Sequence, residues 1–195
     1  MSDSDDLAAL LRQRRAEPHN RVAIDAAIDQ RFGREQAVMF TDMVGFSRTV
    51  EAFGILHFLQ LIQESETLFR PLIQSHGGRL VKQEGDSLLV LFDAPAAALA
   101  CARSMVAATD QVNPGRSAEE RIEVCMGLGY GRLLCIDTSD VWGAEVNAAS
   151  KLGEELAKGS EILVTDRFFQ AVGPSGFAAH GSIFGTRAAY RWMGN

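Results

Sequence analysis

The sequence predicts an α+β domain built around a mainly antiparallel sheet, and three observations support this. The chain has 195 residues, of which 47% are hydrophobic, so it can bury one core and carry an additional segment. From Gln36 onward, short apolar strands alternate with longer helical stretches. The first six of these elements follow the order β, α, β, β, α, β.

The first part of the chain predicts an N-terminal helical extension, residues 1–36, ahead of a main domain, residues 37–195. SDSDDLAALLRQRR begins acidic and ends basic, which suits a short helix and its dipole, and Pro18 ends it. A second helix is predicted for RVAIDAAIDQRF, whose apolar residues recur at helical spacing: Val22, Ile24, Ile28 and Phe32. We expect this extension to be an appendage or an arm that faces a dimer partner.

The main domain opens with a strand, QAVMF, that ends at Asp42. The longest helix is predicted for GILHFLQLIQESETLFRPLIQ, because its apolar residues recur at steps of three and four. GRLVK and DSLLVLF then form a hairpin around a Glu84-Gly85 turn. An Ala-rich helix, PAAALACARSMVAATDQV, leads to RIEVCMGLGYGRLLCI, which we interpret as two strands joined by a tight turn near Gly131. This order is the ferredoxin-like βαββαβ arrangement, with helices on one face of the sheet.

The remaining segments extend this core. A helix is predicted from about Ala144 to Ala157, then the strand ILVT, a short helix DRFFQAV, and strands near FAAHGSIF and RAAYRWM. The GLGYG run does not match GxGxxG and does not lie between a strand and a helix, which argues against a dinucleotide site. We expect its glycines to make a turn and to let backbone approach closely.

Composition excludes several classes of function. A net charge of −6 argues against a general nucleic-acid binder, because non-specific affinity requires basic residues. The most apolar window is interrupted by Asp93, Pro95 and Arg103, so no membrane insertion is expected. The three cysteines form neither a CxxC nor an even set, and the start of the chain does not resemble a signal peptide. A reduced, cytoplasmic protein is predicted.

Two carboxylates are predicted to converge at one edge of the sheet. The first strand ends at Asp42, the third begins at Asp86, and these strands are neighbours in a βαββαβ order. Divalent ions such as Mg²⁺ prefer one or two carboxylates, completed by phosphate and water oxygens. The turn after Asp42 enters a helix, so the amides of residues 43–47 could cradle a phosphate. On these residues alone, Asp42 could instead cap the helix and Asp86 could close a turn.

Three segments in order, FTDMVGFS, KQEGD and DVWGAEVNAASK, resemble the signature segments of the class III nucleotidyl cyclase catalytic domain, the adenylate and guanylate cyclase homology fold. The resemblance runs from about Gln36 to Met193. It implies that Asp42 and Asp86 hold two divalent ions, Mg²⁺ or Mn²⁺. It also implies that the turn containing Gly45 and Phe46 contacts the substrate.

The resemblance implies a preference for adenine. Lys82 stands where adenylate cyclases carry the lysine that contacts the base, and guanylate cyclases usually have glutamate there. Asp140 matches the aspartate that accepts from the adenine amino group. An ammonium can donate to a ring nitrogen and a carboxylate can accept from an exocyclic amine, so ATP is favoured over GTP. Taken alone, Lys82 could be a solvated strand end and Asp140 a turn residue, and Glu84 remains undecided.

The chain departs from the family in two places. Asn147 matches the asparagine that orients the ribose, but Lys151 replaces the arginine that stabilises phosphate charge in the transition state. Lysine keeps the charge and loses the bidentate fork. Phe184 stands where the family usually carries a lysine that contacts the triphosphate. Arg187 could replace that cation or could be an ordinary exposed strand residue.

Together the resemblance implies an adenylate cyclase that converts ATP to 3′,5′-cyclic AMP and pyrophosphate for intracellular signalling. In this family the active sites lie at a homodimer interface. One protomer supplies the metal aspartates, and the other supplies Lys82, Asp140, Asn147 and the residue at Lys151. The alternative is a catalytically impaired pseudo-cyclase, a nucleotide-binding or dimerising regulatory module, and it is motivated by Lys151 and Phe184. A guanylate cyclase is disfavoured by Lys82 and Asp140.

Overall fold

The computed structural model describes residues 2–194, without the side chains of residues 46–49. Its elements in chain order are α1 (Asp3–Ala16), α2 (Arg21–Phe32), β1 (Gly33–Met43), α3 (Phe46–Phe53), α4 (Ile55–Ser75), β2 (Arg79–Glu84), β3 (Ser87–Phe92), α5 (Pro95–Val112), β4 (Val124–Ile136), β5 (Asp140–Trp142), α6 (Ala144–Ser150), β6 (Ile162–Thr165), α7 (Asp166–Val172), β7 (Phe177–Ile183) and β8 (Arg187–Trp192). Short 3₁₀ turns lie at Pro18–Asn20 and Ala118–Glu120, and a π-helical segment, Lys151–Leu156, continues α6.

The strands form one sheet with the order β2-β3-β1-β4-β6-β8-β7, and β5 pairs with the end of β4. β1 lies antiparallel to both β3 and β4, while β4 and β6 are parallel. The predicted α+β class and the βαββαβ order are therefore confirmed for the segment from β1 to β4.

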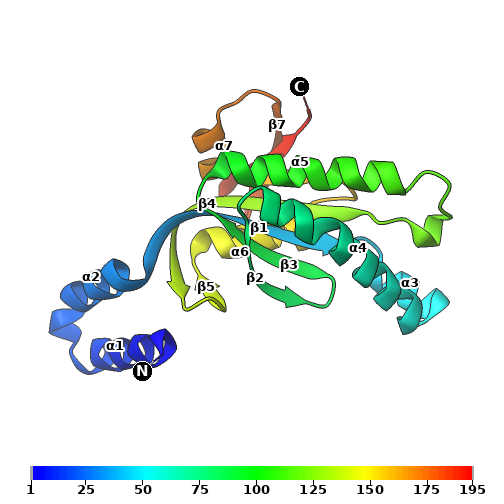
Figure 1. Cartoon of the computed structure of the whole chain (residues 1–195). Coiled ribbons are helices and arrows are strands. Elements are labelled where there is room, and N and C mark those ends of the chain that lie inside the picture. The colour runs from blue at the N-terminus through cyan, green and yellow to red at the C-terminus, as the bar shows by residue number, and fades with distance from the viewer. Residues whose placement is uncertain (1, 195) are drawn as a thin grey trace.

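Helices cover both faces of this sheet, whereas the βαββαβ order predicts helices on one face only. α4 and α5 pack over one face, where Phe58, Phe69 and Met105 are buried against β1, β3 and β4. α6 lies on the opposite face, where Ala149 packs with Val38 of β1 (Figure 1). The sheet is thus buried on both sides at its centre.

The GLGYG run does not make the turn that we expected near Gly131. β4 is one continuous strand through Gly127, Gly129 and Gly131, and the chain reverses only at residues 137–139. The expected close approach of backbone does occur. A Cβ on Gly127 would collide with the carbonyl oxygen of Ala149 and lie 2.7 Å from the amide nitrogen of Gly153. The glycines therefore let α6 lie almost directly on the strand.

The hairpin between β2 and β3 turns one residue later than predicted. Glu84 pairs with Ser87, so Gly85 and Asp86 form the two-residue loop. Gly85 has a φ of 59°, which favours glycine and suits such a turn. Asp86 therefore lies in the turn itself and not in the strand.

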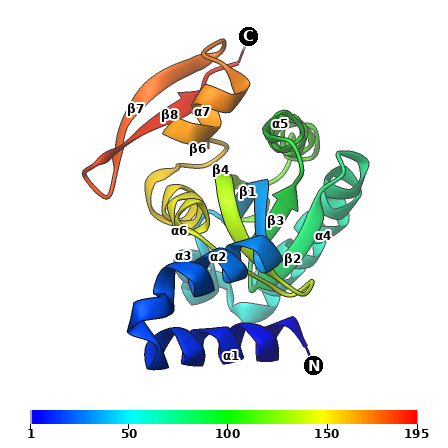
Figure 2. The same cartoon turned by 90° about the vertical axis from the view of Figure 1, so that its left-hand side faces the viewer.

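The two predicted N-terminal helices form an antiparallel hairpin beside the end of β4 (Figure 2). Ile24, Ile28 and Phe32 are buried against Ile136, whereas Val22 is 85% exposed and does not share this face. Ion pairs join Arg14 to Asp25 and Arg132 of β4 to Asp29. The division at residue 36 stays a prediction, and β1 already begins at Gly33.

We predict that Gly127→Ala destabilises the protein by at least about 3 kcal/mol, because the added methyl group would force α6 away from β4. Gly77→Ala is the control, since Gly77 has open space and a φ of 72°, which costs alanine about 1 to 2 kcal/mol. Chemical denaturation of both variants measures the difference. Equal losses of unfolding free energy would contradict the close packing of α6.

Candidate active site

Two aspartates meet where β1 ends and the β2–β3 hairpin turns. β1 pairs with β3 so that Thr41 lies opposite Leu88, which brings Asp42 beside Ser87 and Asp86. The Ser87 hydroxyl donates to Asp42 Oδ1 over 3.1 Å. Asp86 accepts from the backbone amide of Met43. The structure thus brings both predicted metal ligands together.

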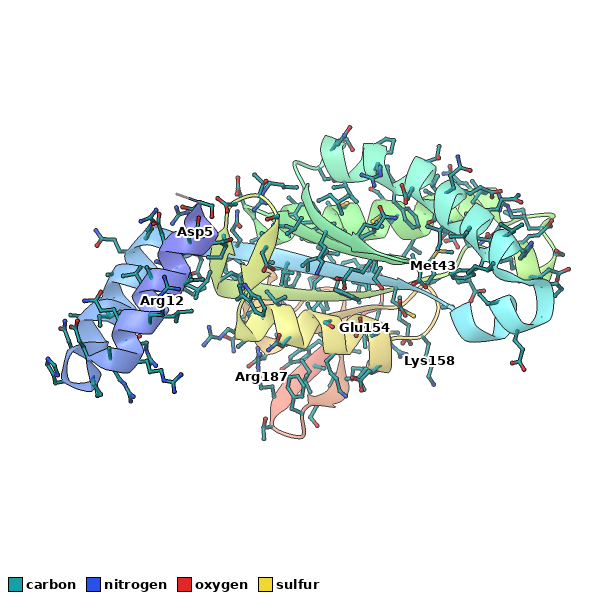
Figure 3. The ribbon with its side chains drawn as sticks, turned by 90° about the horizontal axis from the view of Figure 1, so that it is seen from below. Asp5, Arg12, Met43, Glu154, Lys158 and Arg187 are labelled. Carbon is teal, nitrogen blue, oxygen red and sulfur yellow. The ribbon has the colours of Figure 1, made fainter. Side chains whose placement is uncertain are left out.

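The surroundings disfavour negative charge on both groups. Burial, followed by the neighbouring Asp86 charge, raises the pKa of Asp42 to about 6, although the Ser87 hydrogen bond opposes this. Glu154, at the end of the helical segment that includes α6, adds further repulsion and lies on the Met43 side in Figure 3. Burial also raises the pKa of Asp86, against the backbone amides of Asp86 and Met43 that donate to it.

One carboxylate oxygen in this cluster lacks a partner. Asp86 Oδ2 is buried and accepts no hydrogen bond within the part of the chain that the structure describes. No group of three or more His, Cys, Asp or Glu side chains gathers around one point among the described residues. Two carboxylates with an unused oxygen fit Mg²⁺ or Mn²⁺, whose other ligands are then water and phosphate oxygens. The residues present therefore fit the predicted ions.

The turn after Asp42 enters α3 as expected, but fewer of its amides are available than predicted. Gly45 precedes the helix with a φ of 90°. The amide of Met43 is used by Asp86, and that of Val44 donates to the Glu123 carbonyl over 3.0 Å. A cleft of about 350 Å³ adjoins Gly45 and is bordered by Phe53 and Arg121 among others. The side chain of Phe46 lies outside the described residues.

Lys82 and Asp140, the predicted adenine-selecting pair, also lie close together. Lys82 is on β2 and Asp140 begins β5, and these strands contact each other. The hydrogen bond and charge of Glu84 raise the pKa of Lys82, burial opposes this slightly, and Asp140 raises it further. Glu84, whose role the sequence left undecided, is thus the ion-pair partner of Lys82.

Asn147 and Lys151 lie one helical turn apart at the end of α6. Asn147 is exposed, and Lys151 forms an i,i+4 ion pair with Glu155. Lys151 begins the π-helical segment, a form of helix that often marks functional sites. Among the described side chains, no ion pair or hydrogen bond joins Asn147, Lys82 or Asp140 to the two aspartates, so the candidate residues of the chain form two groups that are not bonded to each other.

The replacement cation that we considered near the end of the chain, Arg187, has partners within the chain. Phe184, at the tip of the β7–β8 hairpin, is 57% exposed. Arg187 donates to Glu145 Oε1 and to Asp166 Oδ1, both over 2.6 Å. Arg187 is therefore ion-paired and partly buried and not an ordinary exposed strand residue, while its contact with a phosphate stays a prediction.

Sequence reasoning missed Glu145, which is only 3% exposed. An acid in the first turn of a helix is usually exposed and interacts with the helix dipole. The position of Glu145 in the sequence therefore does not indicate burial. The available signal was the glycines of β4, which leave room for this side chain: a Cβ on Gly131 would lie 3.3 Å from Glu145 Cγ.

Known proteins resemble the chain in sequence and in fold. Residues 30–182 match the model of the adenylate and guanylate cyclase catalytic domain. A putative adenylate cyclase 3 of Rhizobium meliloti is 28% identical over 71% of this chain and 23% of its own length. An adenylate cyclase of Streptomyces coelicolor is 33% identical over 69% of this chain and 33% of its own. The chain therefore spans a third or less of these two relatives.

A solved structure agrees with these relatives. The adenylate/guanylate cyclase/hydrolase of Silicibacter pomeroyi superposes with a TM-score of 0.72 at 27% identity, covering 84% of this chain and 98% of that one. No helix among residues 2–194 has the length and apolarity needed to cross a membrane. On the family model and the shared fold, the chain belongs to the class III adenylate and guanylate cyclase catalytic domain family.

Proposed function

We propose that the protein is an adenylate cyclase that converts ATP to 3′,5′-cyclic AMP and pyrophosphate. The ribose 3′-oxygen gives up its proton to water and attacks the α-phosphorus in line, while the bond from that phosphorus to pyrophosphate breaks and pyrophosphate leaves. The observation that carries the proposal is the pair of half-buried aspartates, Asp42 and Asp86, with one carboxylate oxygen unused. Two bound divalent ions would lower the pKa of the 3′-hydroxyl and neutralise the triphosphate.

The residues of this chain supply positioning and charge. Asp42 and Asp86 hold the metal side of the site, and the mutual repulsion of these carboxylates makes cation binding favourable. Asn147 orients the ribose, and Lys151 offers its ammonium to the phosphates once it leaves Glu155. We invoke no protein side chain as general base.

The choice of ATP over GTP is supported by the nearness of Lys82 to Asp140. A lysine can only donate, which suits a ring nitrogen of adenine, and a carboxylate can accept from the exocyclic amine. Guanine presents a carbonyl oxygen where adenine has that amine, so Asp140 would repel it. The relatives named as adenylate cyclases point in the same direction.

We further propose that the active site is shared between two copies of the chain. Within one protomer the aspartates and the Lys82, Asp140 and Asn147 group are not joined to each other by hydrogen bonds or ion pairs among the described residues. A head-to-tail homodimer would bring the aspartates of one copy to the second group of the other, giving two equivalent sites.

The second candidate is a pseudo-cyclase that binds nucleotide without turnover. Two observations favour it: Lys151 is held by Glu155, and Phe184 offers no cation at the hairpin tip. Such a module would bind ATP with metal and leave it intact.

We predict that the purified dimer forms cyclic AMP from ATP, and less cyclic GMP from GTP, with Mg²⁺ or Mn²⁺. Asp42→Ala and Asp86→Ala should each lower the rate by at least about a hundredfold. Chromatography of the products measures both, with light scattering to confirm the dimer. A folded dimer that binds ATP by calorimetry and releases neither product would establish the pseudo-cyclase instead.

We predict that Lys82→Glu lowers the ratio of ATP to GTP turnover at least about tenfold, because a carboxylate would repel adenine ring nitrogens and accept from guanine. Arg15→Glu makes the same change in charge on the exposed face of α1 and should leave the ratio unchanged. Competition between the two nucleotides in one reaction measures the ratio. An unaltered ratio in Lys82→Glu would count against the adenine pair.

We predict that, with a chelator present, ionisation of Asp42 costs the folded protein stability as the pH rises from about 4 to 7. The pKa of Asp42 is about 6 in the folded protein and 3.8 ordinarily, so the folded state retains a proton that the unfolded chain releases, and ionising it costs stability. Asp42→Asn should remove most of this loss, whereas Asp110→Asn, on an exposed residue of α5, should not.

Thermal unfolding of these variants at several pH values measures the effect. At pH 7.5, Mg²⁺ should raise the melting temperature of wild type and of Asp110→Asn, and raise that of Asp42→Asn much less. An equal Mg²⁺ response in all three proteins would exclude Asp42 as a metal ligand.

A further inference from the structure

A buried carboxylate lies on the first turn of α6. Glu145 is 3% exposed, and both of its oxygens have partners. Oε2 accepts from the Thr165 hydroxyl of β6 over 2.8 Å and from the Tyr130 amide of β4 over 3.3 Å. Oε1 accepts from Arg187 of β8 over 2.6 Å. One side chain thus ties α6 to three strands of the sheet.

The charge of Glu145 is balanced by a small network. Arg187, whose side chain is 25% exposed, also pairs with Asp166 at the start of α7. Arg167 approaches Glu145 Oε1 from the solvent side, at 3.9 Å. Figure 3 shows Arg187 beside the α6 ribbon. Without Arg187 the negative charge of Glu145 would be buried and largely unpaired, which would lower the stability of the folded protein.

The backbone of β4 is shaped to receive this helix. A Cβ on Gly129 would lie 2.8 Å from the Glu145 carbonyl oxygen, and one on Gly131 would lie 3.3 Å from Glu145 Cγ. The GLGYG run, which has no place in the proposed chemistry, therefore provides the space for Glu145 and the helix behind it. Because the glycines fit the shape of α6 and Arg187 balances the charge of Glu145, α6 has one favoured position on the sheet.

We infer that Glu145 is a positioning residue for the reaction. Resting on the proposed cyclase function, the inference is that Glu145, paired with Arg187, sets where Asn147 stands two residues later and where Lys151 stands six residues later. Asn147 is exposed and lies on the same helix as Glu145, so any slide of α6 along the sheet moves it directly. Arg187 begins β8, so the same carboxylate also ties the Phe184 hairpin to α6.

The variant that tests this is Glu145→Gln. Its carbonyl oxygen can still accept from Thr165 and Tyr130, but its amide would face the Arg187 guanidinium donor to donor. We expect kcat for cyclic AMP formation to fall at least about tenfold, with KM for ATP changed by less than about twofold. Misplaced catalytic groups lower the rate more than they weaken binding.

Arg187→Lys is the second variant, because it keeps the buried charge paired and should fold even if other changes do not. It should show the same kcat loss in milder form, and combining it with Glu145→Gln should add little, as expected for two groups that act as one unit. Glu161→Gln is the matched control. It breaks a comparable ion pair to β8, with Arg191 at 2.9 Å, which does not involve α6.

A second readout keeps the two proposals apart. Hydrogen exchange of the α6 amides, residues 144–150, should rise in Glu145→Gln and not in Glu161→Gln, whether or not the protein turns over ATP. If wild type forms no product, the proposed function fails and the role of Glu145 in the reaction fails with it, while exchange still decides whether Glu145 fixes α6 on the sheet. Unchanged exchange would overturn it, and so would a folded Glu145→Gln with lower melting temperature but wild-type kcat, which would make the role only structural.

Discussion

The antiparallel pairing of β1 with β3 is the constraint on which the candidate site depends. With Thr41 opposite Leu88, the last residues of one strand and the turn before the other share an edge of the sheet. A slip of one residue would carry Asp42 to the other face and separate it from Asp86. In this register the Met43 amide donates to Asp86. The hydrophobic core that fixes the strands, with Met39 and Val90 fully buried, therefore also fixes the carboxylates.

The carboxylates of Glu145 and Asp86 have different surroundings and therefore different roles. Glu145 has a partner for each oxygen and a cation beside it, so its charge is satisfied within the chain. Among the described residues Asp86 has an oxygen without a partner, and the charge of Asp86 acts on a second carboxylate, Asp42. The first arrangement favours a single rigid packing, and the second leaves an attraction that only an outside cation can meet.

Local signals in the sequence predict the α+β class and most of the element order, because the patterns that mark strands, helices and turns lie in neighbouring residues. They also predict that Asp42 and Asp86 meet at one edge of the sheet, as the structure shows. They were insufficient where distant segments decide the outcome. The GLGYG run suggests a turn by itself, and only α6, some twenty residues later, explains why its glycines lie in a strand. No residue near Arg187 in the sequence indicates that Glu145 and Asp166 pair with it. The position of Asp86 differs by one residue from the prediction, because KQEGDS is compatible with a two-residue loop at Glu84-Gly85 or at Gly85-Asp86. The roles of Asn147 and Lys151 stay predictions, since they concern a second copy of the chain.

The junction of the N-terminal helices with the sheet has a mechanical consequence. α2 ends at Phe32 and β1 begins at Gly33, so no loose residue separates them. β1 then runs without interruption to Asp42, about 30 Å farther along an extended strand. Phe32 is buried, and Arg132 forms an ion pair with Asp29 close by. The near end of this strand is therefore fixed to the helical hairpin. A rotation of that hairpin would therefore move β1 as one unit. The movement would reach the far end of the strand, where the carboxylates lie.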